Sequence, residues 1–220
     1  MYEEVCISVD GIDLDGVLTD SVQNKGIIIF SHGSGSSRFS TRNRYVAEQL
    51  NENGFHTLLF DLLTAEEDED YGNRFDISLL TQRLISVVNW VHKNPKYSGL
   101  HTGLFGASTG AASALDAAAE LGYERIKAVV SRGGRPDLAK RIDEVSSPTL
   151  LLVGGLDQEV LELNKKAFTE LNSIRELTVI PGATHLFEEA GKMQEVTDHA
   201  MDWFNRHLKE PAQLEKDYLE

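Results

Sequence analysis

The sequence of 220 residues contains a single cysteine, Cys6. One cysteine can form neither a disulfide within the chain nor a cysteine-rich metal site. Basic residues are also few, since 21 Lys and Arg stand against 35 Asp and Glu and give a formal net charge of −14. Nucleic acids and anionic membranes attract basic proteins. We therefore expect neither a nucleic acid nor a membrane as the partner of this chain.

Long hydrophobic runs are missing as well, and none approaches the roughly 18 apolar residues that span a bilayer. Residues 1–6 are acidic and lack the basic start and apolar centre of a signal peptide. These absences predict a cytoplasmic protein. The length favours one domain over residues 1–220, in which the polar segment 209–220 is expected to fray.

Strand and helix patterns alternate along the rest of the chain. Short runs on either side of Asp10 and Gly11 predict an antiparallel hairpin at one edge of a sheet. The expected strands are residues 5–9, 12–18, 26–31, 55–60, 102–105, 126–131, 149–153 and 176–180, and the expected helices are 42–53, 76–92, 111–121, 160–171 and 188–208. This order predicts an α/β fold with a mostly parallel sheet of about eight strands and helices on both faces. Ligands bind such sheets at the carboxyl ends of the strands.

One turn on this edge carries a serine between two glycines. The segment Gly106–Gly110 reads Gly-Ala-Ser-Thr-Gly and stands between an apolar strand and an Ala-rich helix that Gly122 would end. This pattern is typical of a nucleophile elbow, in which a strained turn presents the serine hydroxyl above the sheet. The turn would also direct the backbone N–H of Thr109 toward a developing oxyanion. As an isolated string, Gly-x-Ser-x-Gly is equally compatible with an ordinary glycine-rich turn.

Two later loops supply the partners that a serine nucleophile needs. Asp157 follows the buried run 149–153, and His185 follows the run 176–180, so both side chains are expected on the same edge as Ser108. The order Ser, Asp, His is that of an α/β-hydrolase triad. Taken singly, Asp157 could instead cap the next helix, and His185 could be a hydrogen-bonded turn residue. No histidine pair stands at metal-ligand spacing with a carboxylate, so we expect no metal.

From residue 26 to residue 208 the chain resembles an α/β-hydrolase, in particular the small, lidless group similar to dienelactone hydrolase. The resemblance is carried by His32–Gly35, Gly106–Gly110, Val153–Asp157 and Pro181–Phe187. The segment between Ser108 and Asp157 is already filled by expected elements, which leaves no room for a large lid. Dienelactone hydrolases use a cysteine nucleophile where this chain has Ser108, and Cys6 is too distant to replace it.

The resemblance implies a role for each motif residue. Ser108 would be the nucleophile, His185 the general base and Asp157 the carboxylate that orients it. The oxyanion would be held by the backbone N–H groups of Thr109 and Ser34. A serine hydrolase acting on small esters or thioesters follows, with no cofactor and with a small-molecule ester as its partner. The alternative is a catalytically silent binding or regulatory domain with the same fold.

Three arginines are expected near this edge. Arg38 lies in the loop after the strand at 26–31, and Arg132 and Arg135 follow the strand at 126–131. Guanidinium groups there could bind a carboxylate or phosphate on the substrate. They could equally pair with nearby acids, such as Asp61 or Asp137, and hold loops in place.

Overall fold

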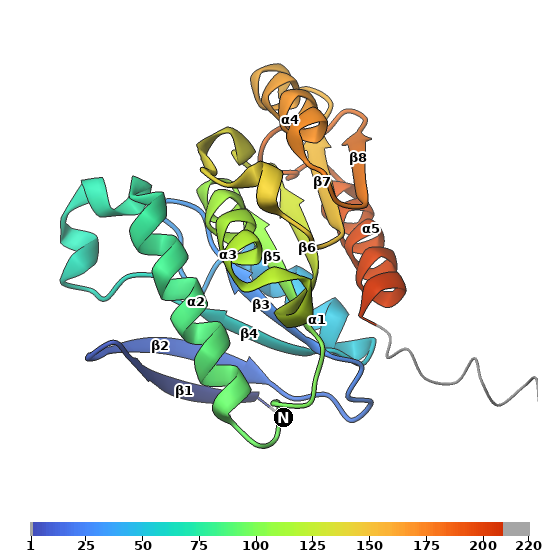
Figure 1. Ribbon diagram of the computed structural model, residues 1–220. Helices are drawn as coiled ribbons and strands as arrows, with labels where there is room; N and C mark the ends of the chain where they lie inside the picture. The colour runs from blue at the N-terminus through green and yellow to red at the C-terminus, as the bar shows by residue number, and fades with distance from the viewer. Residues whose placement is uncertain (1, 209–220) are drawn as a thin grey trace, which may run out of the picture.

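The computed structural model describes residues 2–208, so the predicted fraying of 209–220 lies outside the described residues. The strands are β1 (Tyr2–Val9), β2 (Ile12–Thr19), β3 (Ile27–Ser31), β4 (His56–Phe60), β5 (Thr102–Ala107), β6 (Ile126–Arg132), β7 (Thr149–Gly154) and β8 (Arg175–Ile180). The helices are α1 (Thr41–Glu52), α2 (Ile77–Lys93), α3 (Thr109–Arg125), α4 (Gln158–Glu170) and α5 (Lys192–His207). Together they form the α/β arrangement of strands and helices that the sequence predicts (Figure 1).

The eight strands form one sheet in the order β1-β2-β4-β3-β5-β6-β7-β8. The predicted edge hairpin is confirmed, because β1 pairs antiparallel with β2 and stands at the end of the sheet. Asp10 and Gly11 both have positive φ, at 51° and 80°, as a tight hairpin turn requires. From β4 through β8 all neighbouring strands pair in parallel, so their carboxyl ends share one edge.

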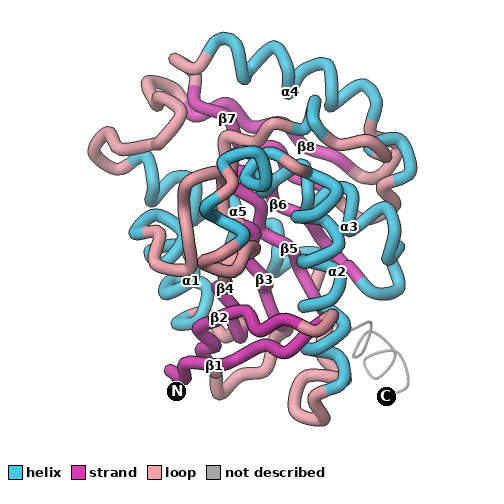
Figure 2. Tube along the Cα trace, turned by 90° about the vertical axis from the view of Figure 1, so that its left-hand side faces the viewer, coloured by secondary structure: helices cyan, strands magenta, loops and turns pink. Residues whose placement is uncertain are grey.

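Helices cover both faces of this sheet, with α2 and α3 on one face and α1 and α5 on the other (Figures 1 and 2). The central strands are buried on both sides because successive side chains point to opposite faces. In β5, Leu104 packs into the core beneath α2 and α3, whereas Phe105 packs into the core beneath α1 and α5. This two-sided burial explains why the strand sequences are continuous apolar runs.

Two helix boundaries differ from the expected ones by more than two residues. The last helix begins at Lys192 rather than at residue 188, because Gly191 adopts the left-handed conformation directly before it. Gly122 interrupts α3 where the sequence predicts the end, with φ of 72°, but a short continuation runs on to Arg125. Neither difference moves a strand end.

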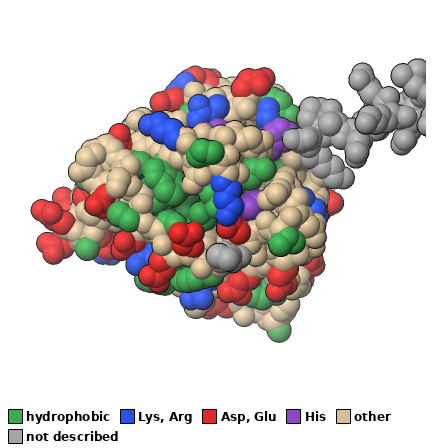
Figure 3. Space-filling model, turned by 90° about the horizontal axis from the view of Figure 1, so that it is seen from below, with side chains coloured by type: hydrophobic (Ala, Val, Ile, Leu, Met, Phe, Trp, Pro, Cys, Tyr) green, Lys and Arg blue, Asp and Glu red, His purple; other side chains and the backbone are tan. Residues whose placement is uncertain are grey.

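The acidic segment after β4 is partly ordered by ion pairs. It contains two short 3-10 turns, η1 (Glu67–Glu69) and η2 (Tyr71–Phe75). Glu67 pairs with Arg83 of α2, and Asp68 pairs with Arg74. Acidic side chains are spread over the face seen in Figure 3 and gather at the edge where this segment projects.

In residues 2–208 the structure has neither a large lid nor a helix that could cross a membrane. Between β6 and β7 the chain forms only loops and two short turns, η3 (Pro136–Leu138) and η4 (Ile142–Glu144), so no large lid stands over the carboxyl edge in residues 2–208. Over that same range, every helix is either too short or too polar to cross a membrane.

Candidate active site

Ser108 occupies a strained turn between β5 and α3. Its φ of 52° and ψ of −122° lie outside the regions that a side chain normally allows. Three backbone hydrogen bonds hold this conformation: the Ser108 N–H donates to the carbonyl of Arg132, and its carbonyl accepts from the N–H groups of Ala111 and Arg135. Strain that the surroundings maintain in this way is characteristic of functional sites.

The flanking glycines are required by close backbone contacts. A Cβ on Gly106 would lie 2.5 Å from the Cα of Ala111 in the first turn of α3. A Cβ on Gly110 would lie 2.3 Å from the carbonyl oxygen of Ser31 and 2.4 Å from that of His32. Only glycine therefore allows α3 to begin this close to β5 and to the loop after β3.

Asp157 and His185 meet beyond the carboxyl ends of β7 and β8. The Nδ1 atom of His185 lies 2.7 Å from a carboxylate oxygen of Asp157, which is a short, charge-assisted hydrogen bond. Asp157 does stand at the N-cap position of α4, but its side chain makes no capping hydrogen bond. Asp157 thus stands where a helix-capping residue would, but its carboxylate binds His185 instead of capping α4.

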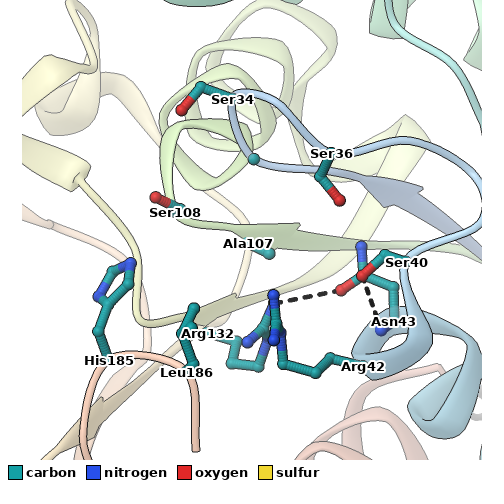
Figure 4. A pocket seen from close by; sticks show the side chains of 11 residues that line it. Ser34, Ser36, Ser40, Arg42, Asn43, Ala107, Ser108, Arg132, His185 and Leu186 are labelled. Carbon is teal, nitrogen blue, oxygen red and sulfur yellow. Dashed lines mark hydrogen bonds between the residues drawn. The ribbon is translucent and has the colours of Figure 1, made fainter.

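Ser108 and His185 line one cavity of about 260 Å³. Figure 4 shows the imidazole of His185 turned toward the Ser108 hydroxyl from the opposite wall. Within residues 2–208 the hydroxyl has no hydrogen-bond partner. Catalytic hydrogen bonds are often long or poorly aligned until substrate is bound. The missing hydrogen bond between Ser108 and His185 is therefore compatible with a serine–histidine pair. The structure thus gathers the three residues predicted as a triad at one edge.

The two expected oxyanion donors lie side by side, but they are not equivalent. The Thr109 N–H is in the first turn of α3, where no carbonyl of the same helix can accept it. The Ser34 N–H already donates to the Thr109 hydroxyl, over 2.8 Å. Ser34 can therefore serve an oxyanion only after this bond is released, whereas the Thr109 amide is available as it stands.

His32 anchors the loop that carries Ser34. Its Nδ1 lies 2.9 Å from the carbonyl oxygen of Gly33, and its Nε2 accepts the N–H of Leu62 over 3.1 Å. Burial lowers the pKa of His32, which favours the neutral ring that this pair of bonds requires. The contacts agree with the interpretation of His32 as a residue that organises the loop.

Only one of the three predicted arginines reaches the cavity. Arg38 is paired with Asp61 and Asp15, and Arg135 is paired with Asp137 at 2.8 Å, so both follow the alternative interpretation. Neither residue lines the cavity, so the predicted three-arginine cluster does not form.

Arg132 lines the cavity, and so does an arginine that the sequence analysis missed, Arg42 in the first turn of α1. Arg132 is 6% exposed, and burial together with the charge of Arg42 lowers its pKa to about 10, so it remains cationic at neutral pH. The sequence did offer one signal for Arg42, because this arginine directly follows the serine-rich loop after β3.

In residues 2–208 no group of three or more His, Cys, Asp or Glu side chains is arranged to hold a metal ion.

Comparisons with known proteins agree with this geometry. The sequence model of the Dienelactone hydrolase family matches residues 14–210. A dienelactone hydrolase from Anabaena variabilis is 48% identical in sequence, with a TM-score of 0.91 over 95% of this chain and 99% of that chain. Est1E from Butyrivibrio proteoclasticus has a TM-score of 0.78 over 92% of this chain and 98% of its own, and at 19% identity it supports the fold alone.

A curated relative of different name is also similar. A Mycobacterium tuberculosis protein, provisionally named a phosphoribosyl transferase, is 53% identical over 211 residues. The match covers 96% of this chain but 47% of that protein, so the chain spans about half the length of the curated relatives it matches.

Proposed function

The chain belongs to the dienelactone hydrolase family, and we propose that within this family it is a serine hydrolase of small carboxylic esters or thioesters. Family membership supports hydrolase activity in general. The serine mechanism and the ester substrate are our proposal, and they rest on the site geometry. The transferase name belongs to relatives about twice as long, and we do not assign that activity to this chain.

The observation that carries the proposal is the meeting of a strained serine with a carboxylate-bound histidine in one cavity. Ser108 projects from an elbow that close backbone contacts maintain. His185 lines the same cavity, and Asp157 lies 2.7 Å from its far nitrogen. A serine needs such a base to become nucleophilic, and the base needs a fixed tautomer.

The proposed reaction has two acyl-transfer steps. The Oγ of Ser108 attacks the ester carbonyl while His185 takes its proton. The resulting oxyanion accepts the N–H of Thr109, and also that of Ser34 once the bond from Ser34 to the Thr109 hydroxyl is released. His185 then gives the proton to the departing alcohol or thiol, which leaves an acyl-serine. A water deprotonated by His185 attacks this acyl group, and the acid is released as Ser108 regains its proton.

Asp157 stays ionised throughout this cycle. Its bond to Nδ1 leaves Nε2 of His185 to face Ser108, and its negative charge stabilises the imidazolium that forms in each step. The chemistry is complete with these side chains and backbone amides.

The cavity favours small substrates. At about 260 Å³, it is below the usual range for drug-sized ligands, and no large lid closes over it in the described residues. Because the nucleophile is Ser108 rather than a cysteine, we propose ordinary esters over dienelactone itself as substrates.

Release of p-nitrophenol from p-nitrophenyl acetate and butyrate tests the proposal. The wild type should turn over, and the Ser108→Ala variant should lose activity by several orders of magnitude while remaining folded. If both proteins are inactive, labelling of the wild type by a fluorophosphonate decides the matter. Labelling of Ser108 supports an activated serine with a different ester substrate, and absence of labelling favours a binding or regulatory domain.

A further inference from the structure

Arg132 is a buried cation without an acidic partner. Its side chain ends in the cavity beside Ser108, where a single NH₂ group donates to the amide oxygen of Asn43 over 3.3 Å. Its Nε has no hydrogen-bond partner, and no carboxylate pairs with it among residues 2–208. Burying an unpaired charge destabilises a fold unless a counter-ion is supplied. A ligand anion in the cavity would supply it.

The first turn of α1 adds further donors to the same wall. Arg42 is close enough to Arg132 to lower its pKa, and Figure 4 shows both guanidinium groups beside the residues that begin α1. The backbone N–H of Arg42 has no carbonyl of its own helix within reach, so it presents partial positive charge beside the cavity that Arg42 lines. Ser36 and Ser40 place hydroxyl groups along this wall.

We propose that this wall of the cavity binds a phosphate group that forms part of the ester substrate. The wall is defined by Arg132, Arg42 and the N-terminus of α1, and we call it the anion wall. The proposal rests on the proposed function, because the anion wall and the nucleophile Ser108 share one cavity. The phosphate and the scissile carbonyl therefore belong to one small molecule.

A phosphate fits the anion wall better than a carboxylate does, for reasons of charge and shape. A phosphate monoester carries nearly two negative charges above pH 7, and its three free oxygens accept hydrogen bonds from different directions. The wall presents two guanidinium groups, of which only that of Arg42 is shared with an acid, Glu188 at 2.8 Å. It also lies beside the N-terminus of α1, and helix N-termini bind phosphate in many proteins.

Matched acetate esters test the charge preference. We would compare 3-acetoxypropyl phosphate with neutral 3-acetoxypropanol and with the carboxylate 4-acetoxybutanoate at pH 7.5, following acid release. The wild type should favour the phosphate over the neutral ester by about 10-fold or more in kcat/KM, as one charge-assisted contact supplies. Equal values for the two esters, or a preference for the carboxylate, would overturn the proposal.

Variants locate the effect. Arg42→Gln and Arg132→Lys should each reduce the phosphate-to-neutral ratio by about 10-fold, because Arg132→Lys keeps the charge but loses the planar pair of donors. Arg44→Gln is the matched control, since Arg44 is exposed on α1 outside the cavity, and its ratio should match the wild type. Equal loss on both esters in the two cavity variants would contradict a phosphate contact.

Binding of inorganic phosphate separates this inference from the proposed function. Phosphate should raise the melting temperature of the wild type above that in chloride of equal ionic strength, and Arg132→Met should abolish the increase. If phosphate has no such effect while p-nitrophenyl acetate is hydrolysed, the anion wall is refuted and the hydrolase stands. If phosphate stabilises the wild type but no ester is hydrolysed, the anion site stands and its place on an ester substrate is refuted.

Discussion

The bond between Asp157 and His185 makes the sharpest prediction. Asp157 has two possible uses, as the N-cap of α4 and as the carboxylate that orients His185. Replacing it with asparagine separates them, because Asn caps a helix as well as Asp does but carries no charge. The Asp157→Asn variant should therefore remain folded and lose its activity.

The size of the loss follows from the contact. A charge-assisted hydrogen bond of 2.7 Å contributes about 1.5–3 kcal/mol, which corresponds to a factor of about 10 to 150 in rate. In the Asp157→Asn variant the side-chain amide can also turn its NH₂ toward Nδ1 and impose the wrong imidazole tautomer, which in a serine protease costs a factor of about 10⁴. We expect kcat/KM to fall between about 10² and 10⁴-fold, while the free energy of unfolding falls by no more than about 1.5 kcal/mol, because Asn replaces the charge-assisted hydrogen bond by a neutral one.

The assay combines p-nitrophenyl acetate hydrolysis with urea denaturation of the same preparations. Asp137→Asn is the control, because Asp137 is exposed and pairs with Arg135 outside the cavity. It should retain wild-type kcat/KM. An Asp157→Asn enzyme with activity within twofold of the wild type would refute the orienting role.

Two further predictions concern the loop after β3. Gly110→Ala should lower the free energy of unfolding by about 3 kcal/mol in urea denaturation, because the new Cβ would meet two backbone carbonyls. Gly99→Ala is the control, and it should change this free energy by less than about 0.5 kcal/mol because the space around Gly99 is open. Burial holds the pKa of His32 in the folded protein below its usual value near 6.5. The neutral ring therefore stabilises the fold above about pH 6.5, and this contribution is lost as the pH falls through the folded pKa. Unfolding free energies at pH 7.5 and 5.0 should therefore differ less in His32→Gln than in the wild type, and an unchanged difference would contradict this role of His32.

Local sequence patterns were sufficient for the strands, the edge hairpin and the elbow. Continuous apolar runs predict strands that are covered on both faces, and β5 and β7 have that burial. The same patterns place Ser108, Asp157 and His185 after strands whose carboxyl ends share an edge. Parallel pairing then brings them together whatever the details of the helices.

Helix ends were predicted less well, because several amino acids can begin or end a helix and neighbouring turns decide among them. The start of α5 depends on the left-handed backbone of Gly191, which no apolar periodicity reveals. The hydrogen bond from the Ser34 amide was not predictable either, since its acceptor is a side chain 75 positions away.

The sheet, the elbow and the three residues predicted as a triad follow from the linear sequence, because each depends on a short string and on the rule that parallel strands end together. Which arginines reach the cavity depends instead on how the folded elements pack. Arg38 and Arg135 are neutralised by acids, while Arg132 is buried without one and is joined by Arg42 from α1. The ion-pair partner of a charged side chain depends on which distant elements pack beside it, and local sequence patterns do not predict that packing.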